Sequence, residues 1–185
     1  MCSLYQDKLF VISAPSAGGK TTIVNRLVSL LNGELTRVIT CTTRPKREGE
    51  VQGVDYNFIT KDEYDIYLKN GLFAENAVVY GNFYGVLKSD LEKRGIKVIS
   101  LDSKGVKNFK KQGIKATYVL IIPPSLEILK ERLLKRASER PEDVQVRLFE
   151  AKNEMDAAED FDYVVINDDL DKAVTECKKI INGEM

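Results

Sequence analysis

A short segment near the N-terminus carries residues that together could bind the phosphates of a nucleotide. It follows the apolar run at residues 9–12 and ends in Lys20 and Thr21, where a helical pattern begins. Gly18 and Gly19 leave backbone N–H groups open to an anion, and the start of a helix adds unpaired donors and partial positive charge. Lys20 would bring a full positive charge to the phosphates, and Thr21 would offer a hydroxyl to Mg²⁺. The layout is that of a P-loop, whose residues here are Ala14, Pro15, Ser16, Ala17, Gly18, Gly19, Lys20, Thr21 and Thr22.

The first position of this loop departs from the usual pattern, which begins with glycine and here begins with Ala14. Alanine is the smallest replacement, so we expect the loop to keep its shape. The alternative is a glycine-rich turn that binds nothing. The strand-like run before the loop and the helical pattern after it favour phosphate binding.

The composition narrows the range of chemistry. The 28 basic residues balance the 28 acidic ones, whereas a protein that binds long nucleic acid usually carries a basic excess. The absence of histidine excludes histidine bases, histidine metal ligands and a Ser-His-Asp triad. We therefore expect no nucleic-acid partner, and chemistry that depends on positioned charge.

The same composition favours a cytoplasmic protein with a single domain over residues 1–185. Cys2, Cys41 and Cys177 are odd in number and lack the paired spacing of a metal site, which favours free thiols in a reducing compartment. No apolar stretch approaches membrane-spanning length, and the first residues lack the basic start and long apolar run of a secretory signal. We expect neither a membrane partner nor export.

The elements that must position the loop alternate along the chain. Strands interleaved with helices favour an α/β fold with a mostly parallel sheet. Near-continuous apolar runs suit strands that are covered on both faces. These patterns predict strands at 9–12, 38–39, 98–101, 118–122 and 163–166, and helices at 22–31, 103–111, 126–137 and 170–181.

Two regions interrupt this alternation. From about residue 40 to 86 the chain is rich in Tyr, Phe, Gly and short strand-like runs, which predicts a small insertion with antiparallel strands. From about residue 125 to 155 it is helical and heavily charged, and we expect Pro141 to start a second helix there. The core would then comprise about 1–39, 87–124 and 156–185.

One stretch, residues 40–58, closely resembles the nucleoside-monophosphate-binding segment of guanylate kinases. It reads Thr-Cys-Thr-Thr-Arg-Pro-Lys-Arg-Glu-Gly-Glu-Val-Gln-Gly-Val-Asp-Tyr-Asn-Phe. The resemblance runs nearly the full chain and includes residues 81–85 and 165–170. It implies a P-loop kinase fold: a central, mostly parallel five-stranded sheet with flanking helices, a small mixed α/β GMP-binding insertion and a helical lid. It further implies transfer of the γ-phosphoryl group of ATP to GMP, giving ADP and GDP, with Mg²⁺ as cofactor.

Two arginines in the insertion are suited to binding a phosphate. Arg44 and Arg47 lie three apart among Gly and Pro residues, and their forked guanidinium groups match phosphate oxygens in pairs. Tyr56 and Tyr84 could each give a hydroxyl to the same phosphate. The alternative for two loop arginines is plain solvated charge. The resemblance instead assigns all four residues to GMP.

Glu75 is the candidate reader of the base. A carboxylate only accepts hydrogen bonds, and guanine offers two adjacent donors, N1–H and the 2-amino group, whereas adenine has an acceptor at N1. Unpaired buried groups cost about 1–3 kcal/mol, so this contact could supply much of the base choice. Without the resemblance, a surface glutamate at a strand end would be the simpler interpretation. The resemblance adds Thr40 and Asp102 to the GMP-binding residues.

The chain departs from the family at two places near the base and the phosphates. Val86 stands where most members have Ser or Thr, whose hydroxyl helps bind the guanine O6. We expect guanine selectivity to persist through Glu75 and Thr40, with weaker O6 recognition. Ser100 replaces the first carboxylate of the usual Asp-x-Asp, so we expect slower turnover, while Asp102 remains and could serve the base, or Mg²⁺ through water.

The charged helical region would form the lid. Arg132 and Arg136 are four apart and share one helix face, and nearby glutamates permit a simpler account as surface ion pairs. The resemblance makes both ATP-binding residues and brings Arg147 onto the transferring group. Asn167 could be a turn residue or lie near the adenine of ATP. By this resemblance the catalytic residues are Lys20, Arg44, Arg136 and Arg147.

Two other functions remain open from the sequence. Guanylate-kinase-like domains of membrane-associated scaffold proteins bind phosphopeptides without catalysis, but they typically lose the P-loop lysine and glycines, which are intact here. A P-loop kinase for another acceptor is kept open by Val86. The expected partners are ATP and GMP, with dGMP as a further candidate acceptor, in a monomer or homodimer.

Overall fold

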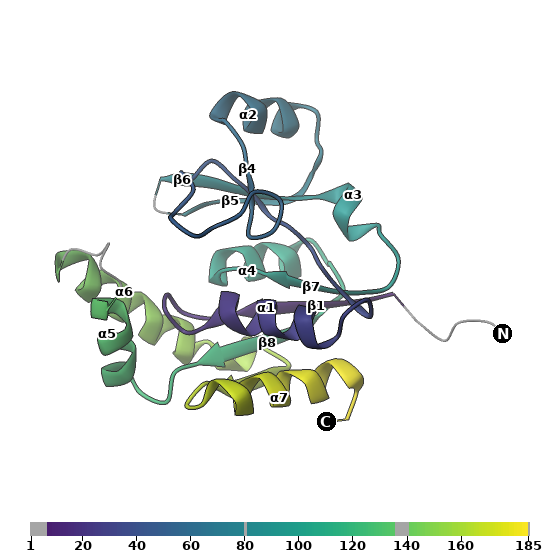
Figure 1. Cartoon of the computed structure of the whole chain (residues 1–185). Coiled ribbons are helices and arrows are strands. Elements are labelled where there is room, and N and C mark those ends of the chain that lie inside the picture. The colour runs from purple at the N-terminus through teal and green to yellow at the C-terminus, as the bar shows by residue number, and fades with distance from the viewer. Residues whose placement is uncertain (1–6, 80, 136–140, 185) are drawn as a thin grey trace.

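The computed structural model describes residues 7–79, 81–135 and 141–184, and within them a central sheet forms the middle layer (Figure 1). Its strands run parallel in the order β2-β7-β1-β8-β9, as the register of each pair shows. The strands are β1 (Lys8–Ser13), β2 (Leu35–Arg37), β7 (Ile96–Ser100), β8 (Thr117–Ile122) and β9 (Tyr163–Ile166).

Helices cover both faces of this sheet. In β1, Phe10 and Ile12 pack into one buried cluster with side chains of the helices α1 (Lys20–Leu30) and α7 (Leu170–Asn182). Val11, between them, points to the other face, where it packs with Phe109 of α4 (Ser103–Lys111). Successive side chains of a strand alternate between faces, so apolar residues at consecutive positions require cover on both sides.

The region after β2 builds a second sheet, here called the insertion sheet, with strand order β4-β3-β6-β5. Its β3 and β4 are parallel and its other pairs antiparallel, so it is mixed, whereas the strand-like runs alone favoured antiparallel pairing. At Gly85 any side chain would meet the buried ring of Phe73, with an added Cβ 2.4 Å from a ring carbon. The strands are β3 (Cys41–Thr42), β4 (Asn57–Phe58), β5 (Phe73–Val79) and β6 (Asn82–Leu87).

Two helices belong to the same region, α2 (Lys61–Lys69) and the short α3 (Lys88–Leu91). Thr60 caps α2 through a reciprocal capping box with Glu63. Tyr64 is buried between the helix and the rings of Phe73 and Phe83. Figure 1 shows α2 and the insertion sheet on the side of α4 that faces away from the central sheet.

A pair of helices follows β8 and lies at one end of the molecule (Figure 1). The helices are α5 (Leu126–Lys135) and α6 (Pro141–Asp156), followed by a short 3₁₀ turn, Ala158–Asp160. They pack on each other through Leu129, Leu133, Val144 and Ala151, a buried cluster separate from the core. As expected, a helix begins at Pro141.

The structure confirms the predicted fold class, with one displaced strand. The sequence placed a strand at residues 38–39, but β2 ends at Arg37. Val38 still donates a backbone hydrogen bond to Val98, and its side chain is buried with those of α4. The apolar residues at 38–39 therefore reflect burial just after the strand and not the strand itself. None of the described helices is long and apolar enough to cross a membrane.

Candidate active site

A cleft of about 750 Å³ opens between the central sheet, the insertion sheet and α6. Ser13 and Ser100, at the carboxyl ends of β1 and β7, line this cleft. Ligands of open parallel sheets bind at this edge of the sheet. The cleft brings together most of the predicted site residues from distant parts of the sequence. These are Ala14, Pro15, Ser16, Ala17, Gly18, Gly19, Lys20, Thr21, Thr22, Thr40, Arg44, Arg47, Tyr56, Glu75, Tyr84, Asp102 and Arg147.

The P-loop is shaped by its own backbone and by one asparagine. Gly19 has a φ of 102°, a left-handed value that favours glycine, and it stands directly before the first residue of α1. The Asn167 side chain is buried and donates a 2.8 Å hydrogen bond to the carbonyl of Gly18. A Cβ on Gly19 would lie 2.3 Å from that amide nitrogen. Asn167 therefore supports the loop from behind and does not line the cleft.

Among the described residues, no side chain caps the start of α1. Its first N–H groups are therefore available to an anion, and the helix adds partial positive charge there. Ala17, two residues before the helix cap, adopts a left-handed φ of 64°. Such a conformation is uncommon without glycine and is concentrated at binding sites.

Lys20 is held at this helix start by the end of β7. Its ammonium group donates a 3.0 Å hydrogen bond to the carbonyl of Leu101. Burial lowers the pKa of Lys20, while the negative charges of Asp102 and Glu154 act in the opposite direction. The cation is thus placed beside the loop with less water around it than a surface lysine has.

Asp102 and Glu154 form the acidic side of the cleft. Asp102 caps α4, because its carboxylate accepts a 2.7 Å hydrogen bond from the N–H of Gly105. Glu154 accepts a 2.8 Å hydrogen bond from the hydroxyl of Ser103, and burial raises its pKa. Sequence reasoning missed Glu154. The available signal was its spacing of seven residues from Arg147, which places both on one face of α6.

Arg44 is anchored on the insertion side of the cleft. Its guanidinium group forms a 2.6 Å ion pair with Glu50 and lies 5.4 Å from the centroid of the Tyr56 ring. Burial alone would raise the pKa of Glu50, but Arg44 and the backbone N–H of Arg47 hold it below its usual value. Glu50 was not predicted, and it fixes the direction in which Arg44 points.

The two predicted tyrosines stand next to each other. The rings of Tyr56 and Tyr84 meet edge to face, with centroids 6.1 Å apart, and burial raises the pKa of Tyr56. Arg47 is exposed at the same side of the cleft. Thr40 is nearly buried and its carbonyl accepts a hydrogen bond from the N–H of Asn57. Arginine and phenol donors thus share one side of the cleft.

Glu75 is a carboxylate almost without solvent contact, since only 1% of the residue is exposed. It lies on β5, and its side chain accepts a 3.1 Å hydrogen bond from the amide of Asn108 on α4. Burial raises the pKa of Glu75 to about 7, although the hydrogen bond from Asn108 acts to lower it. A buried acceptor that opens on a cleft is suited to a ligand with paired donors.

The two departures from the family pattern have different environments. Val86 pairs with Glu75 in the insertion sheet, but its side chain is fully buried and packs with Val11 and Phe109. Ser100 lines the cleft, and its hydroxyl is the buried side-chain oxygen that has no hydrogen-bond partner among the described residues. Val86 thus contributes to the core, whereas the site around Ser100 can accept another polar group.

The predicted lid arginines are placed differently. Arg147 of α6 donates a 2.8 Å hydrogen bond to the hydroxyl of Ser16 in the P-loop. Arg132 of α5 donates a 2.9 Å hydrogen bond to the carbonyl of Asn167 and does not line the cleft. Arg136 lies outside the described residues.

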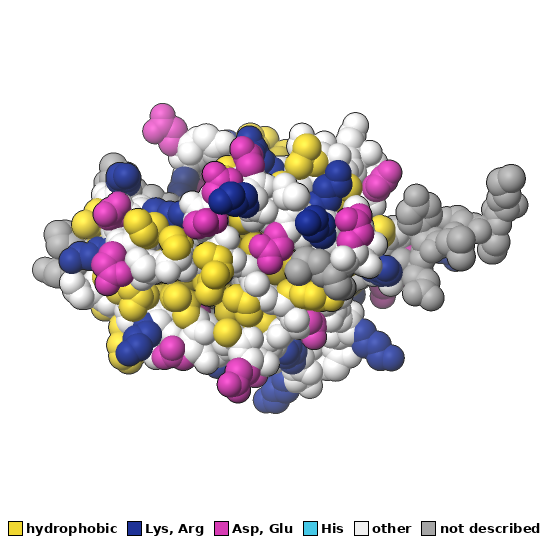
Figure 2. Space-filling model, turned by 90° about the horizontal axis from the view of Figure 1, so that it is seen from below, with side chains coloured by type: hydrophobic (Ala, Val, Ile, Leu, Met, Phe, Trp, Pro, Cys, Tyr) yellow, Lys and Arg dark blue, Asp and Glu magenta, His cyan; other side chains and the backbone are white. Residues whose placement is uncertain are grey.

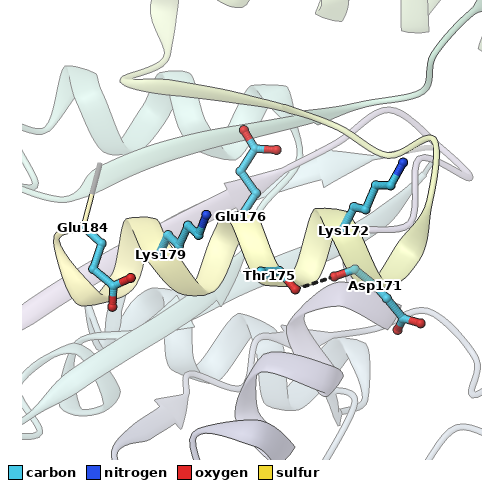
Figure 3. Close-up of a pocket in the computed structure, with 6 residues that line it drawn as sticks. All are labelled: Asp171, Lys172, Thr175, Glu176, Lys179 and Glu184. Carbon is cyan, nitrogen blue, oxygen red and sulfur yellow. Dashed lines mark hydrogen bonds between the residues drawn. The ribbon is translucent and has the colours of Figure 1, made fainter.

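A second concavity, of about 580 Å³, runs along α7 (Figure 3). Its walls come from one helix and the turn after it. The hydrogen bond drawn there runs within that helix, from the Thr175 hydroxyl to the backbone carbonyl of Asp171. Acidic and basic side chains alternate along it and do not converge on a point. Its lining residues are Asp171, Lys172, Thr175, Glu176, Lys179 and Glu184.

Comparison with known proteins decides the family. The sequence profile described as guanylate kinase matches residues 6–184. The chain belongs to the guanylate kinase family. A guanylate kinase of Legionella pneumophila is 37% identical over 98% of this chain and 88% of its own length. A guanylate kinase of Wolbachia sp. subsp. Brugia malayi is 43% identical over 95% of this chain and 92% of its own length.

A solved structure agrees with the family. A guanylate kinase from Anaplasma phagocytophilum has a TM-score of 0.77 at 28% identity and covers 98% of this chain and 89% of that chain. The family and the P-loop kinase fold predicted from the sequence are confirmed. The roles of individual residues remain predictions.

The raised pKa of Glu75 predicts a stability effect. A carboxyl group whose pKa rises from 4.5 to about 7 on folding weakens the folded state as pH increases through that range. We expect Glu75→Gln to be more stable than wild type by about 3 kcal/mol at pH 8, falling to about 1 kcal/mol or less at pH 5. Urea unfolding at the two pH values measures this difference.

The matched control is Glu34→Gln, which removes an exposed carboxylate. It should change the free energy of unfolding little at either pH. A Glu75→Gln effect that is the same at pH 5 and pH 8 would contradict the account.

Proposed function

We propose a division of roles within the cleft for the reaction of this family, ATP-dependent phosphorylation of GMP to GDP. The P-loop side would bind ATP, and the insertion sheet would bind GMP. The observation that carries this proposal is Glu75, a buried carboxylate opening on the same cleft as the P-loop. A phosphate cradle alone fits many kinases, whereas an acceptor for paired donors points to guanine.

The ATP phosphates would lie against the start of α1. The N–H groups there and the left-handed turn at Gly19 provide donors for phosphate oxygens, and Lys20 adds a full charge. Asn167 keeps the loop in shape through the carbonyl of Gly18. Its closeness to the adenine stays a prediction, and so does the contact of Arg132 with ATP.

The described residues fit a Mg²⁺ ion bound mainly by phosphates and water. They contain no group of three or more Cys, Asp or Glu side chains that could hold a metal by themselves, and Mg²⁺ in kinases typically uses one or two protein ligands. Thr21 would offer its hydroxyl, and Asp102 its free carboxylate oxygen through water. The chemistry supplied on binding is neutralisation of phosphate charge.

GMP would occupy the opposite side. Arg44 and Arg47, with the hydroxyls of Tyr56 and Tyr84, would bind its phosphate as charge-assisted donors. Glu75 would accept from N1–H and the 2-amino group of guanine. Thr40, and Asp102 near the base, complete the set that we assign to GMP.

The helices α5 and α6 would act as the lid. Arg147 already reaches the P-loop through a hydrogen bond to Ser16, and this contact supports its assignment to the transferring phosphoryl group. Arg136 would act with it. Phosphoryl transfer depends on positioning and charge, and a closed lid keeps water from competing as acceptor.

The setting that we propose is the cytoplasm. Cys41 and Cys177 are buried free thiols, and burial raises their pKa to about 11 and about 12, so neither is a reactive thiolate. Figure 2 shows acidic and basic side chains interspersed on the α7 face, without a field of one sign. The partners that we assign are small molecules, ATP and GMP, with dGMP as a candidate acceptor.

The acceptor range tests the proposal. An ADP-release assay with Mg²⁺ should give a kcat/KM for GMP about 10² times that for AMP, UMP or dTMP, because only guanine pairs its two donors with Glu75. The buried Val86 cannot donate to O6, so selectivity would rest on Glu75 and Thr40. Comparable rates with AMP and GMP would refute it.

The role of Arg147 is tested by truncation. Arg147→Ala should lower kcat by about 10³ with the melting temperature nearly unchanged, because the lost charge acts on the transferring group. Lys152→Ala, exposed on the same helix, is the control and should keep normal turnover. Near-normal kcat in Arg147→Ala would remove this residue from the mechanism.

The unpartnered hydroxyl of Ser100 predicts a gain of function. Ser100→Asp would restore the carboxylate that the family usually places there, and we expect kcat to rise roughly threefold or more. Ser100→Asn has the same shape without the charge and should not share the gain. An unchanged kcat in Ser100→Asp would count against a role for that carboxylate.

A further inference from the structure

Asn108 joins the core to the insertion sheet at the position of Glu75. Its side-chain amide nitrogen on α4 donates to the carboxylate of Glu75 at 3.1 Å and to the backbone carbonyl of Asn76 at 3.2 Å. A primary amide has two hydrogens, so the two acceptors of β5 account for both. This pairing fixes the amide relative to the strand and the carboxylate relative to the amide.

Nothing else that the described residues place around Glu75 favours its ionised form. The hydrogen bond from Asn108 is the one made to this carboxylate within the described part of the chain. Asp102, at the start of the same helix, is a like charge that opposes ionisation. Tyr64 of α2 is a neutral acid near Glu75, and β6 places the apolar Val86 opposite it.

We propose that Asn108 is a positioning residue for guanine recognition: it orients the Glu75 carboxylate and stabilises its charge. This inference rests on the assignment of Glu75 to guanine. Asn108 donates to one oxygen of the Glu75 carboxylate. To bind N1–H and the 2-amino group of guanine together, both carboxylate oxygens must be able to accept a hydrogen bond. A protonated Glu75 has lost part of that capacity, so the action of Asn108 falls on GMP and not on ATP.

The test is a split of kinetic constants over pH. We expect Asn108→Ala and Asn108→Leu, the second with the same branched side-chain skeleton as Asn, to raise KM for GMP about tenfold at pH 7. KM for ATP and kcat should stay within about twofold. Without the Asn108 donor, the pKa of Glu75 should rise above its value of about 7. In the variants, KM for GMP should therefore begin to increase at a higher pH than in wild type as the pH is lowered. At pH 9, where Glu75 is ionised in both proteins, the difference in KM between variant and wild type should be smaller.

Controls separate positioning from general damage. Gln112→Ala removes an exposed amide at the end of the same helix, outside the cleft, and should leave the constants unchanged. In a Glu75→Gln background, Asn108→Ala should change KM for GMP less than twofold, because the two residues act as one unit. Melting temperatures identify any variant that fails to fold, and Asn108→Leu then serves alone.

Several outcomes overturn the inference. A rise in KM that is equal for GMP and ATP, or one that is the same from pH 6 to pH 9, marks Asn108 as structural only. If Glu75→Gln raises KM for GMP and Asn108→Ala does not, the positioning role alone fails. If Glu75→Gln leaves KM for GMP unchanged, the guanine assignment of Glu75 fails and the role of Asn108 fails with it.

Discussion

The start of α1 is the constraint on which the rest of the cleft depends. A phosphate chain needs several N–H donors and a cation in one small volume, and no side chain may occupy that volume first. The chain meets this need with Gly19 as helix cap and with Lys20 tied to the carbonyl of Leu101. Asn167, which contacts the loop at Gly18, follows β9, and Leu101, which contacts Lys20, follows β7. The carboxyl edge of the sheet therefore supports both the loop and the lysine.

The same cleft holds two charges that burial disfavours. Burial lowers the pKa of Lys20 and raises that of Glu75, so each group is less stable in its charged form than it would be in water. In the proposed complex both charged forms would gain partners, a phosphate for Lys20 and a guanine for Glu75. On this proposal, groups that would serve a ligand reduce the stability of the free protein.

The sequence predicted those parts of the fold that depend on local pattern. The apolar runs located β1, β7, β8 and β9 to within about two residues, and α4 matched its predicted range. The P-loop was found because its chemistry lies in consecutive residues. The helix α2 was missed, although Thr60 and Glu63 carry the capping-box spacing that announces a helix start.

Contacts between distant segments could not be predicted in the same way. Asn108 and Glu75 are 33 residues apart, and Asn167 and Gly18 are 149 apart, so no spacing rule relates them. Glu50 lies six residues from Arg44 in a loop, where no helical or strand period applies. Such residues hold the predicted ones in place. Family resemblance supplied the candidate substrate-binding groups, and the structure was needed for the groups that support them.

The central claim is that the helix start and one ammonium group bind the triphosphate of ATP. Calorimetric titration with magnesium-loaded ATP or a non-hydrolysable analogue tests it most directly. The account predicts heat release from one site per chain, weakened about tenfold or more in Lys20→Ala, which removes the cation and leaves the loop backbone. Absence of heat with the wild-type protein, or equal affinity in Lys20→Ala, would contradict it.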